Sequence, residues 1–195
     1  MIREALKPYT ASAPCYRVGG FASQRLIVTD PGPVGPIEVT RAFRIGPAAS
    51  TPLTSPMPEI CSDSALAANG IFKVFRSSNS KTSVDLSVFE TLGVQYLRDT
   101  ADCSLMLLDE IGGHELTCKP FMNALYELLS GDIPCIGVIK LTDSTKRMDP
   151  ALFDLNSQLR HRILNEFDGK ILYYERGDET VRKIINDYLE GILHE

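Results

Sequence analysis

Two adjacent carboxylates, Asp109 and Glu110, directly follow the apolar run Leu105–Leu108. Such a run is typical of a strand that is buried on both faces of a parallel sheet. Ligands of open parallel sheets bind outside the carboxyl ends of the strands, which is where these acids are predicted to lie. One carboxylate could hold a hydrated Mg²⁺, and the next could orient or deprotonate a water molecule. The alternative is that the two acids only begin a surface loop.

The elements that must position these acids alternate between helix and strand from residue 83 onward. Apolar residues at helical spacing predict four helices, which begin at Ser83 or Asp85, at Thr117, at Asp149-Pro150 and at Asp178 or Thr180. Short apolar runs between them predict strands over Ser104–Leu108, Ile133–Ile139 and Ile171–Tyr174. This alternation indicates a parallel sheet with helices on its faces.

The first half of the chain has shorter β-type runs. Cys15–Val18 is predicted to be a strand that ends at Gly19-Gly20, and Ile71–Phe75 a further strand. Leu26–Thr29 and Ile37–Phe43 flank a turn rich in Pro and Gly, which predicts a hairpin. Arg44–Glu59 is rich in Pro, Ser and Ala and is predicted to be a loop, either a lid or a variable segment.

Size and charge narrow the class of protein. A chain of 195 residues with 44% hydrophobic and 23% charged residues is expected to form one globular domain, spanning 1–195. Its net charge of −5 argues against a general role in binding nucleic acid or a membrane surface. The five cysteines are widely spaced, which disfavours a disulfide framework or a zinc site. We therefore expect a cytoplasmic location; the sequence does not indicate a protein partner.

Two segments carry a resemblance to a known family. The stretch LLDEIGGHELTCKPFMNALYELLSGDIPCIGVIK and the early YRVGGF block resemble the small P-loop nucleoside-triphosphatases of the cancer-related NTPase and THEP type. In that family the D-E-I-G-x-x-E-L segment is the Walker B motif. Ser23-Gln24 departs from the family, which more often has Thr and an acid there.

The resemblance implies roles for four residues. Asp109 would hold the Mg²⁺ shell, Glu110 would activate the attacking water, and Glu115 would order the loop or its water network. Lys140 would lie near the γ-phosphate, with a solvated lysine as the alternative. Apart from the resemblance, Arg147 and Arg160 could contact the phosphates of the nucleotide, although a surface salt bridge is the favoured alternative for each.

The resemblance also implies a fold and a reaction. The fold would be a three-layer α/β fold of the P-loop (RecA-like) type, with a mostly parallel sheet flanked by helices and an added β-hairpin. The reaction would be Mg²⁺-dependent hydrolysis of ATP or GTP to the diphosphate and phosphate, with loose base selectivity. A non-hydrolysing relative that acts as an interaction or regulatory domain is the alternative.

The phosphate-binding pattern G-x-x-x-x-G-K-[ST] does not occur in the sequence. Met1–Leu6 looks like the continuation of the helix that follows this loop in the family, so we expect a chain that starts at an internal methionine and lacks one strand and the loop. The contrary hypothesis is a protein that has lost the loop. A sheet order that does not place Leu105–Leu108 beside the absent strand would favour an unrelated doubly wound binding domain.

Overall fold

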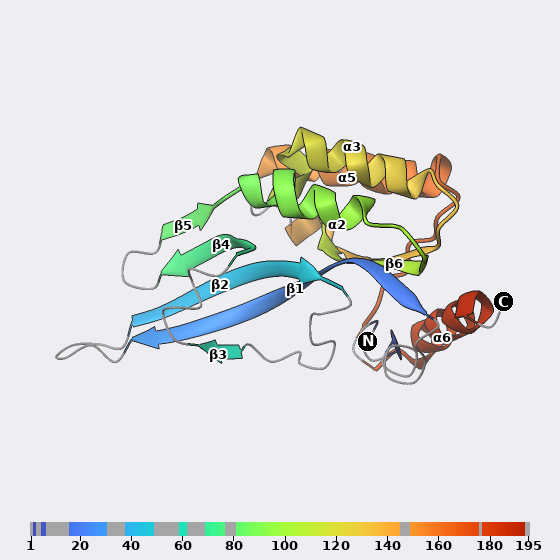
Figure 1. Ribbon diagram of the computed structural model, residues 1–195, viewed down its shortest axis with the longest axis horizontal. Coiled ribbons are helices and arrows are strands. Elements are labelled where there is room, and N and C mark those ends of the chain that lie inside the picture. Colours follow the sequence, from blue (N-terminus) through green and yellow to red (C-terminus); the bar gives the residue numbers. More distant parts are fainter. Residues whose placement is uncertain are drawn as a thin grey trace.

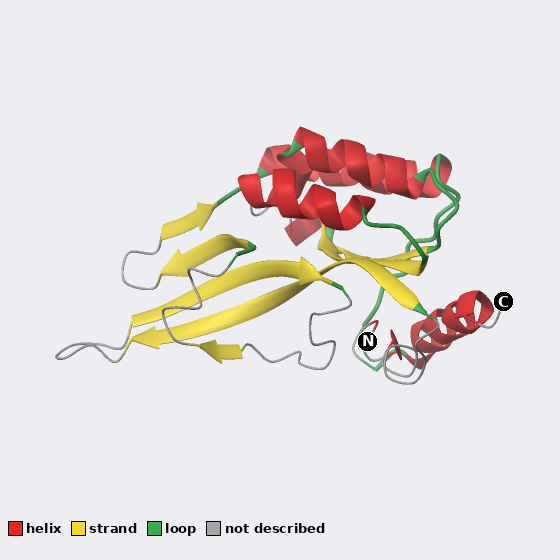
Figure 2. Ribbon diagram, in the orientation of Figure 1, coloured by secondary structure: helices red, strands yellow, loops and turns green. Residues whose placement is uncertain are grey.

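The structure is a computed structural model with an α/β fold (Figures 1 and 2). It describes residues 2, 5–6, 16–30, 38–48, 59–61, 69–76, 81–144, 149–175 and 177–193. Among these residues, no helix is long and apolar enough to cross a membrane. The predicted hairpin turn around Pro33 and most of the predicted Arg44–Glu59 loop lie outside the described residues, although the segment up to Pro47 belongs to a strand.

Seven strands form one sheet in the order β5-β4-β2-β1-β6-β7, with β3 paired to β1 off this path. The strands are β1 (Arg17–Asp30), β2 (Glu38–Pro47), β3 (Glu59–Cys61), β4 (Ile71–Arg76), β5 (Lys81–Val84), β6 (Cys103–Ile111) and β7 (Cys135–Ile139). The β1–β3, β1–β6 and β6–β7 pairs are parallel. The β1–β2, β2–β4 and β4–β5 pairs are antiparallel. The expectation of a mostly parallel sheet is therefore wrong for the described strands: the sheet is mixed. Short connections in the first half can join antiparallel neighbours only, because a parallel pair needs a long crossover.

β1 is one long strand that joins the two parts of the sheet. Its residues Val18–Phe21 pair with Leu105–Leu108 of β6, and from Phe21 onward it pairs with β2. The prediction that the first strand ends at Gly19-Gly20 is wrong, since the strand continues through both glycines. Gly20 has a φ of +83°, and a Cβ there would lie 2.2 Å from the carbonyl oxygen of Leu107. Gly20 thus allows the backbones of β1 and β6 to approach closely.

Helices cover both faces of the parallel part of the sheet (Figure 1). They are the π-helical turn Phe89–Gly93, α2 (Val94–Arg98), the 3₁₀ turn His114–Thr117, α3 (Lys119–Leu129), α5 (Pro150–Asn165) and α6 (Glu179–Leu193). α2, α3 and α5 pack on one face, where Met106 and Leu108 of β6 contribute to the core. α6 and the helical residues Ile2 and Leu6 pack on the other face, against Leu105 and Leu107.

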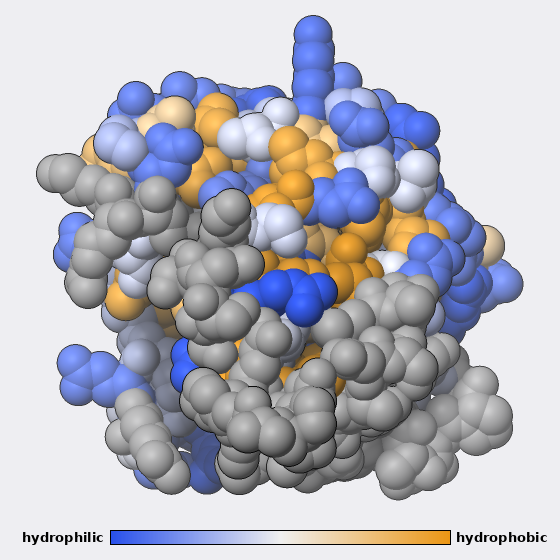
Figure 3. Space-filling model, turned by 90° about the vertical axis from the view of Figure 1, so that its left-hand side faces the viewer, coloured by the Kyte–Doolittle hydropathy of each residue, from blue (hydrophilic) through white to orange (hydrophobic). Residues whose placement is uncertain are grey.

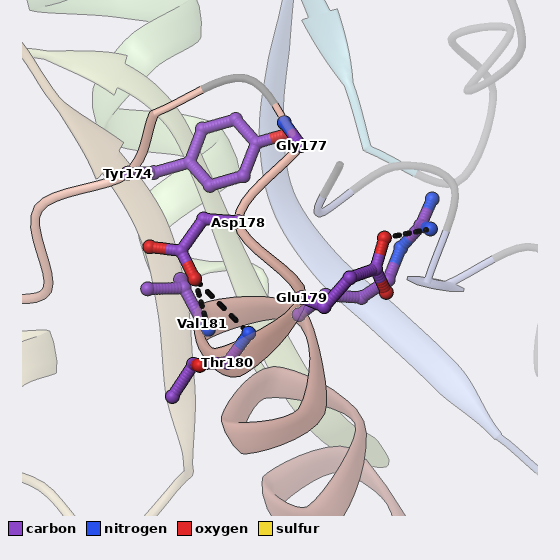
Figure 4. A network of polar contacts seen from close by, with 7 residues as sticks. Tyr174, Gly177, Asp178, Glu179, Thr180 and Val181 are labelled. Atoms are coloured by element: carbon purple, nitrogen blue, oxygen red, sulfur yellow. Dashed lines mark hydrogen bonds and ion pairs between the residues drawn. The ribbon is translucent and has the colours of Figure 1, made fainter.

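Aspartates begin the last two helices: Asp149 was predicted for the first, and Asp178 is the one formed of the two predicted starts, Asp178 and Thr180, of the second. Asp149 accepts a hydrogen bond from the backbone N–H of Ala151 at 2.9 Å and precedes α5. Asp178 accepts from the N–H groups of Thr180 and Val181 at 3.0 and 3.1 Å, and these bonds close the first turn of α6 (Figure 4). Both side chains satisfy donors that a helix leaves without an internal partner.

The starts of the two earlier helices were predicted less well. Asp85 accepts a bond from the N–H of Ser87 at 3.0 Å, so Asp85 rather than Ser83 begins that helix. The prediction that Thr117 caps α3 is wrong. Its hydroxyl donates instead to the carbonyl of His114 at 2.7 Å, and Cys118 precedes α3 without a side-chain cap.

The predicted strand Ile171–Tyr174 is not formed. The segment 168–175 has no regular secondary structure, and Tyr173 is 72% exposed. A strand needs a neighbour to pair its backbone groups, and no described strand lies beside this segment. β6 lies between β1 and β7, so the described sheet order does not place Leu105–Leu108 beside an absent strand. Taken alone, this order would favour the unrelated doubly wound domain.

The close approach of β1 and β6 predicts opposite effects for two glycine substitutions. Gly20→Ala should lower the free energy of unfolding by at least ~2 kcal/mol, because the new Cβ collides with Leu107 in a left-handed backbone. Gly191→Ala should leave this free energy unchanged or raise it by up to ~1 kcal/mol, because the new Cβ in α6 would have no described atom within 4 Å beyond the adjoining residues and helix backbone. Urea unfolding measures both. Equal stability of Gly20→Ala and the wild type would refute this account of the β1–β6 contact.

Candidate functional site at the carboxyl end of β6

The central residues of β6 provide a rigid support for the acids that follow. Leu105, Met106 and Leu107 are fully buried and Leu108 is 3% exposed. Alternate side chains enter the two hydrophobic clusters on opposite faces of the sheet, as the unbroken apolar run predicts. This part of the sequence analysis is confirmed, and β6 ends at Ile111 just beyond the two carboxylates.

Asp109 is held by the residue that follows the GGF segment of β1. It accepts hydrogen bonds from the backbone N–H of Ser23 at 3.0 Å and from the Ser23 hydroxyl at 3.2 Å. Phe21 pairs with Leu108, and Ser23 lies two residues further along the same strand. The long β1 strand therefore brings Ser23 beside the end of β6. Sequence analysis missed this residue as a site member, although the departure from the family pattern at Ser23-Gln24 marked the position.

Glu110 has an unusual backbone conformation for a residue with a side chain. Its φ of +64° lies in the left-handed region, which costs a non-glycine residue about 1–2 kcal/mol. Its carboxylate lies 3.4 Å from the Ser23 hydroxyl and 3.8 Å from a guanidinium nitrogen of Arg25. Glu110 lies within β6, next to its last residue, and its side chain is 29% exposed. Left-handed residues of this kind concentrate at functional sites.

The turn after β6 is closed by Glu115. This residue is 3% exposed, and its carboxylate accepts a hydrogen bond from the backbone N–H of Gly113 at 2.6 Å. Gly112 has a φ of +103°, which lets the chain reverse direction there. The contact orders the loop that follows Asp109 and Glu110. His114, between Gly113 and Glu115, is partly buried, and this burial lowers the pKa of its imidazole.

Lys140 reaches the same place from the end of β7. Its backbone N–H donates to the carbonyl of Ile111 at 2.8 Å, which ties the ends of β6 and β7 together. Its ammonium lies close to Gly113, since a Cβ built on that glycine would be 2.6 Å from Lys140 Nζ. The structure thus brings four predicted site residues together: Asp109, Glu110, Glu115 and Lys140 line one cavity.

Two residues of α5 hydrogen-bond to the turn after β6 and to the end of β7. Asn156 is fully buried and donates to the carbonyls of Gly112 and Lys140 at 3.3 and 3.2 Å. Arg160 donates to Asn156 Oδ1 at 2.9 Å and to the Lys140 carbonyl at 2.8 Å. These bonds use the Arg160 guanidinium to hold the end of β7, where the sequence suggested a phosphate contact or a surface salt bridge. Sequence analysis missed Asn156, whose signal is a polar residue on the apolar stripe of a helix, four residues after Leu152.

The remaining predicted site residue, Arg147, lies outside the described residues. A second cavity of about 540 Å³ is lined by residues that include Ser104 and Asp187. It lies by the opposite end of β6, and the Asp187 carboxylate is paired with Lys183 at 2.6 Å. Among the described residues, the three acids predicted as site residues, Asp109, Glu110 and Glu115, lie together at the carboxyl end of β6.

A magnesium ion fits the donor chemistry of this end of the sheet. Among the described residues, no three His, Cys, Asp or Glu side chains gather closely enough to hold a metal by themselves. Mg²⁺ does not require such a cluster, because it usually takes one or two carboxylates together with substrate phosphates and water. Asp109 and Glu110 supply two neighbouring carboxylates of the required hard-oxygen type.

Comparison with known proteins identifies the class. A family profile described as NTPase matches residues 62–167, which is more than half of the chain and includes β6, β7 and α5. The chain therefore belongs to the NTPase family, and its resemblance to the small P-loop nucleoside-triphosphatases is confirmed. The alternative of an unrelated doubly wound domain is wrong.

Individual relatives agree with this class. The chain is 28% identical to the nucleoside-triphosphatase THEP1 of Methanosarcina barkeri over 131 residues, 66% of this chain and 68% of the relative. It is 28% identical to that of Methanosarcina acetivorans over 137 residues, 67% and 69% of the two chains. The THEP1 of Thermotoga maritima is 29% identical over 106 residues, 51% of this chain and 60% of its own length. No solved structure matches the chain.

The left-handed backbone of Glu110 predicts an unusual response to glycine. Glu110→Gly should be as stable as the wild type or up to ~1 kcal/mol more stable in urea unfolding, because glycine adopts a positive φ without strain. Glu127→Gly is the matched control. It lies exposed in α3, where glycine should cost about 1 kcal/mol. A fall of more than about 1 kcal/mol in the free energy of unfolding of Glu110→Gly would contradict the inference that the Glu110 backbone is strained.

Proposed function

We propose that the protein hydrolyses nucleoside triphosphates to the diphosphate and phosphate at the carboxyl end of β6. The observation that carries the proposal is the Asp109–Glu110 pair, anchored through Ser23 and placed beside Lys140 in a chain of the NTPase family. Relatives named nucleoside-triphosphatase support the same reaction class. We further propose that the sheet is the core of a three-layer RecA-like fold.

Glu110 is proposed to act on the attacking water. Its left-handed backbone turns its partly exposed carboxylate toward the cavity, where it can accept a proton from water. The nearby Arg25 guanidinium, at 3.8 Å, can orient this carboxylate. Glu115 is proposed to act indirectly, by keeping the Gly113 turn in place.

Asp109 is proposed to hold the Mg²⁺ shell, and Lys140 to contact the phosphates. When bound, the ion would neutralise charge on the phosphate oxygens. The two bonds from Ser23 fix the Asp109 carboxylate in one orientation. Asn156 and Arg160 bind the carbonyl oxygen of Lys140 and so fix the backbone from which its ammonium extends. Arg147 is proposed as a further phosphate contact, and ATP and GTP are proposed to serve equally.

The role of Glu110 predicts a loss of turnover with retention of binding. In the full-length protein, Glu110→Gln should lower the Mg²⁺-dependent release of phosphate from ATP by roughly 100-fold or more, as expected for loss of a general base. Calorimetry should give a nucleotide affinity within a fewfold of the wild type. Glu90→Gln, exposed on the helix before α2, is the control and should behave as the wild type.

Each outcome decides between defined alternatives. Unchanged hydrolysis in Glu110→Gln would refute the role of Glu110. Wild-type protein that binds nucleotide but releases no phosphate would instead support the non-hydrolysing alternative. Release of phosphate in EDTA would exclude the proposed Mg²⁺ dependence.

The role of Asp109 predicts a changed metal requirement. Asp109→Asn should raise the Mg²⁺ concentration that gives half-maximal activity by roughly tenfold or more, since a charge-assisted contact is worth about 1.5–3 kcal/mol. A titration of activity with Mg²⁺ at saturating nucleotide measures this shift. An unchanged midpoint would assign the metal to other residues.

A further inference from the structure

The cavity at the carboxyl end of β6 extends well beyond the acids. Its volume is about 330 Å³, which lies within the range of small-molecule sites. Besides the acids, residues of strands β1, β2 and β4 line it. The face of the molecule on the left of Figure 1 carries hydrophobic surface patches interrupted by strongly hydrophilic side chains (Figure 3).

Aromatic side chains line the same cavity as the acids. Phe43 and Phe72 are only partly buried, and their ring centroids lie 6.3 Å apart. Phe72 also packs on the buried Phe89, with 4.9 Å between the ring centroids. This support holds the two outer rings in place, so that they present aromatic surface on which a planar ring could stack.

Cations accompany these aromatic side chains. Lys73 Nζ lies 5.5 Å from the centre of the Phe43 ring and lines the cavity with Arg25 and Lys140. Burial, together with the charge of Lys140, lowers the pKa of Lys73. A bound anion would offset both effects, because it favours the charged form of the lysine.

We propose that this cavity binds a small molecule in which an aromatic ring is joined to an anionic group such as a phosphate. The ring would lie against Phe43 and Phe72, and the anion beside Lys73. This proposal rests on the proposed function only for its biological use, since binding itself requires neither Mg²⁺ nor hydrolysis. Two sources share this chemistry: the base end of the nucleoside triphosphate itself, or a separate aromatic phosphate bound next to it.

Phenyl phosphate is the probe that tests the proposal. Titrated without Mg²⁺ or nucleotide and followed by NMR, it should bind the full-length protein at least fivefold more tightly than inorganic phosphate, because stacking adds to the ionic contact. It should also shift the amide signals of Phe43, Phe72 and Lys73. Equal affinity for the two anions, or shifts confined to other residues, would overturn the proposal.

Two variants and a control sharpen the test. Phe72→Leu keeps an apolar side chain and should weaken phenyl phosphate binding roughly fivefold through loss of stacking. Lys73→Gln should weaken it roughly tenfold through loss of the ionic contact. Lys119→Gln, an exposed lysine of α3, should change nothing. Folded variants, as judged by amide spectra and urea midpoints, that bind like the wild type would refute the assignment of these side chains.

Competition identifies the source of the ligand. If ATP displaces phenyl phosphate but inorganic tripolyphosphate does not, the cavity is the site of the nucleotide base. If phenyl phosphate and ATP bind together, it takes a separate molecule. Both results support the proposal, and both can be measured even if the protein does not hydrolyse nucleotides.

Discussion

The site depends on one constraint, the burial of β6 between two parallel neighbours with apolar side chains on both of its faces. Leu105–Leu108 have almost no exposed surface, so the position at which the strand becomes polar is fixed by the core. The first residues beyond it, Asp109 and Glu110, emerge where β1 and Lys140 also reach the same edge. A hydrophobic run of four residues thus determines where the carboxylates lie.

The chain then builds two layers of support around the acids. Ser23 donates to the Asp109 carboxylate. Asn156 donates to the carbonyls of Gly112 and Lys140, and Arg160 donates to that of Lys140. Buried polar groups are costly unless they are hydrogen-bonded, and no buried side-chain polar atom of the described residues lacks a partner. The polar network can therefore fix the geometry of the site without destabilising the core.

Local chemistry made part of this structure predictable. The apolar run of β6 and the aspartates before α5 and α6 have effects within a few residues of their own position, and these predictions are confirmed. The mixed sheet was missed because strand partners depend on contacts between distant residues. Ser23 and Asn156 were missed for the same reason, since their partners lie 86 and 44 residues away. The strand predicted at Ile171–Tyr174 had suitable residues but no described neighbour to pair with.

The central claim is that the carboxyl end of β6 holds a metal and a triphosphate. Paramagnetic broadening by Mn²⁺, a substitute for Mg²⁺, tests it most directly when added to the full-length protein with a non-hydrolysable nucleoside triphosphate. We expect the amide signals of Ser23, Glu110 and Ile111 to broaden and those of Cys103 and Ser104, at the other end of β6, to stay sharp. Broadening at the Cys103 end, or none at Ser23 and Glu110, would contradict the account.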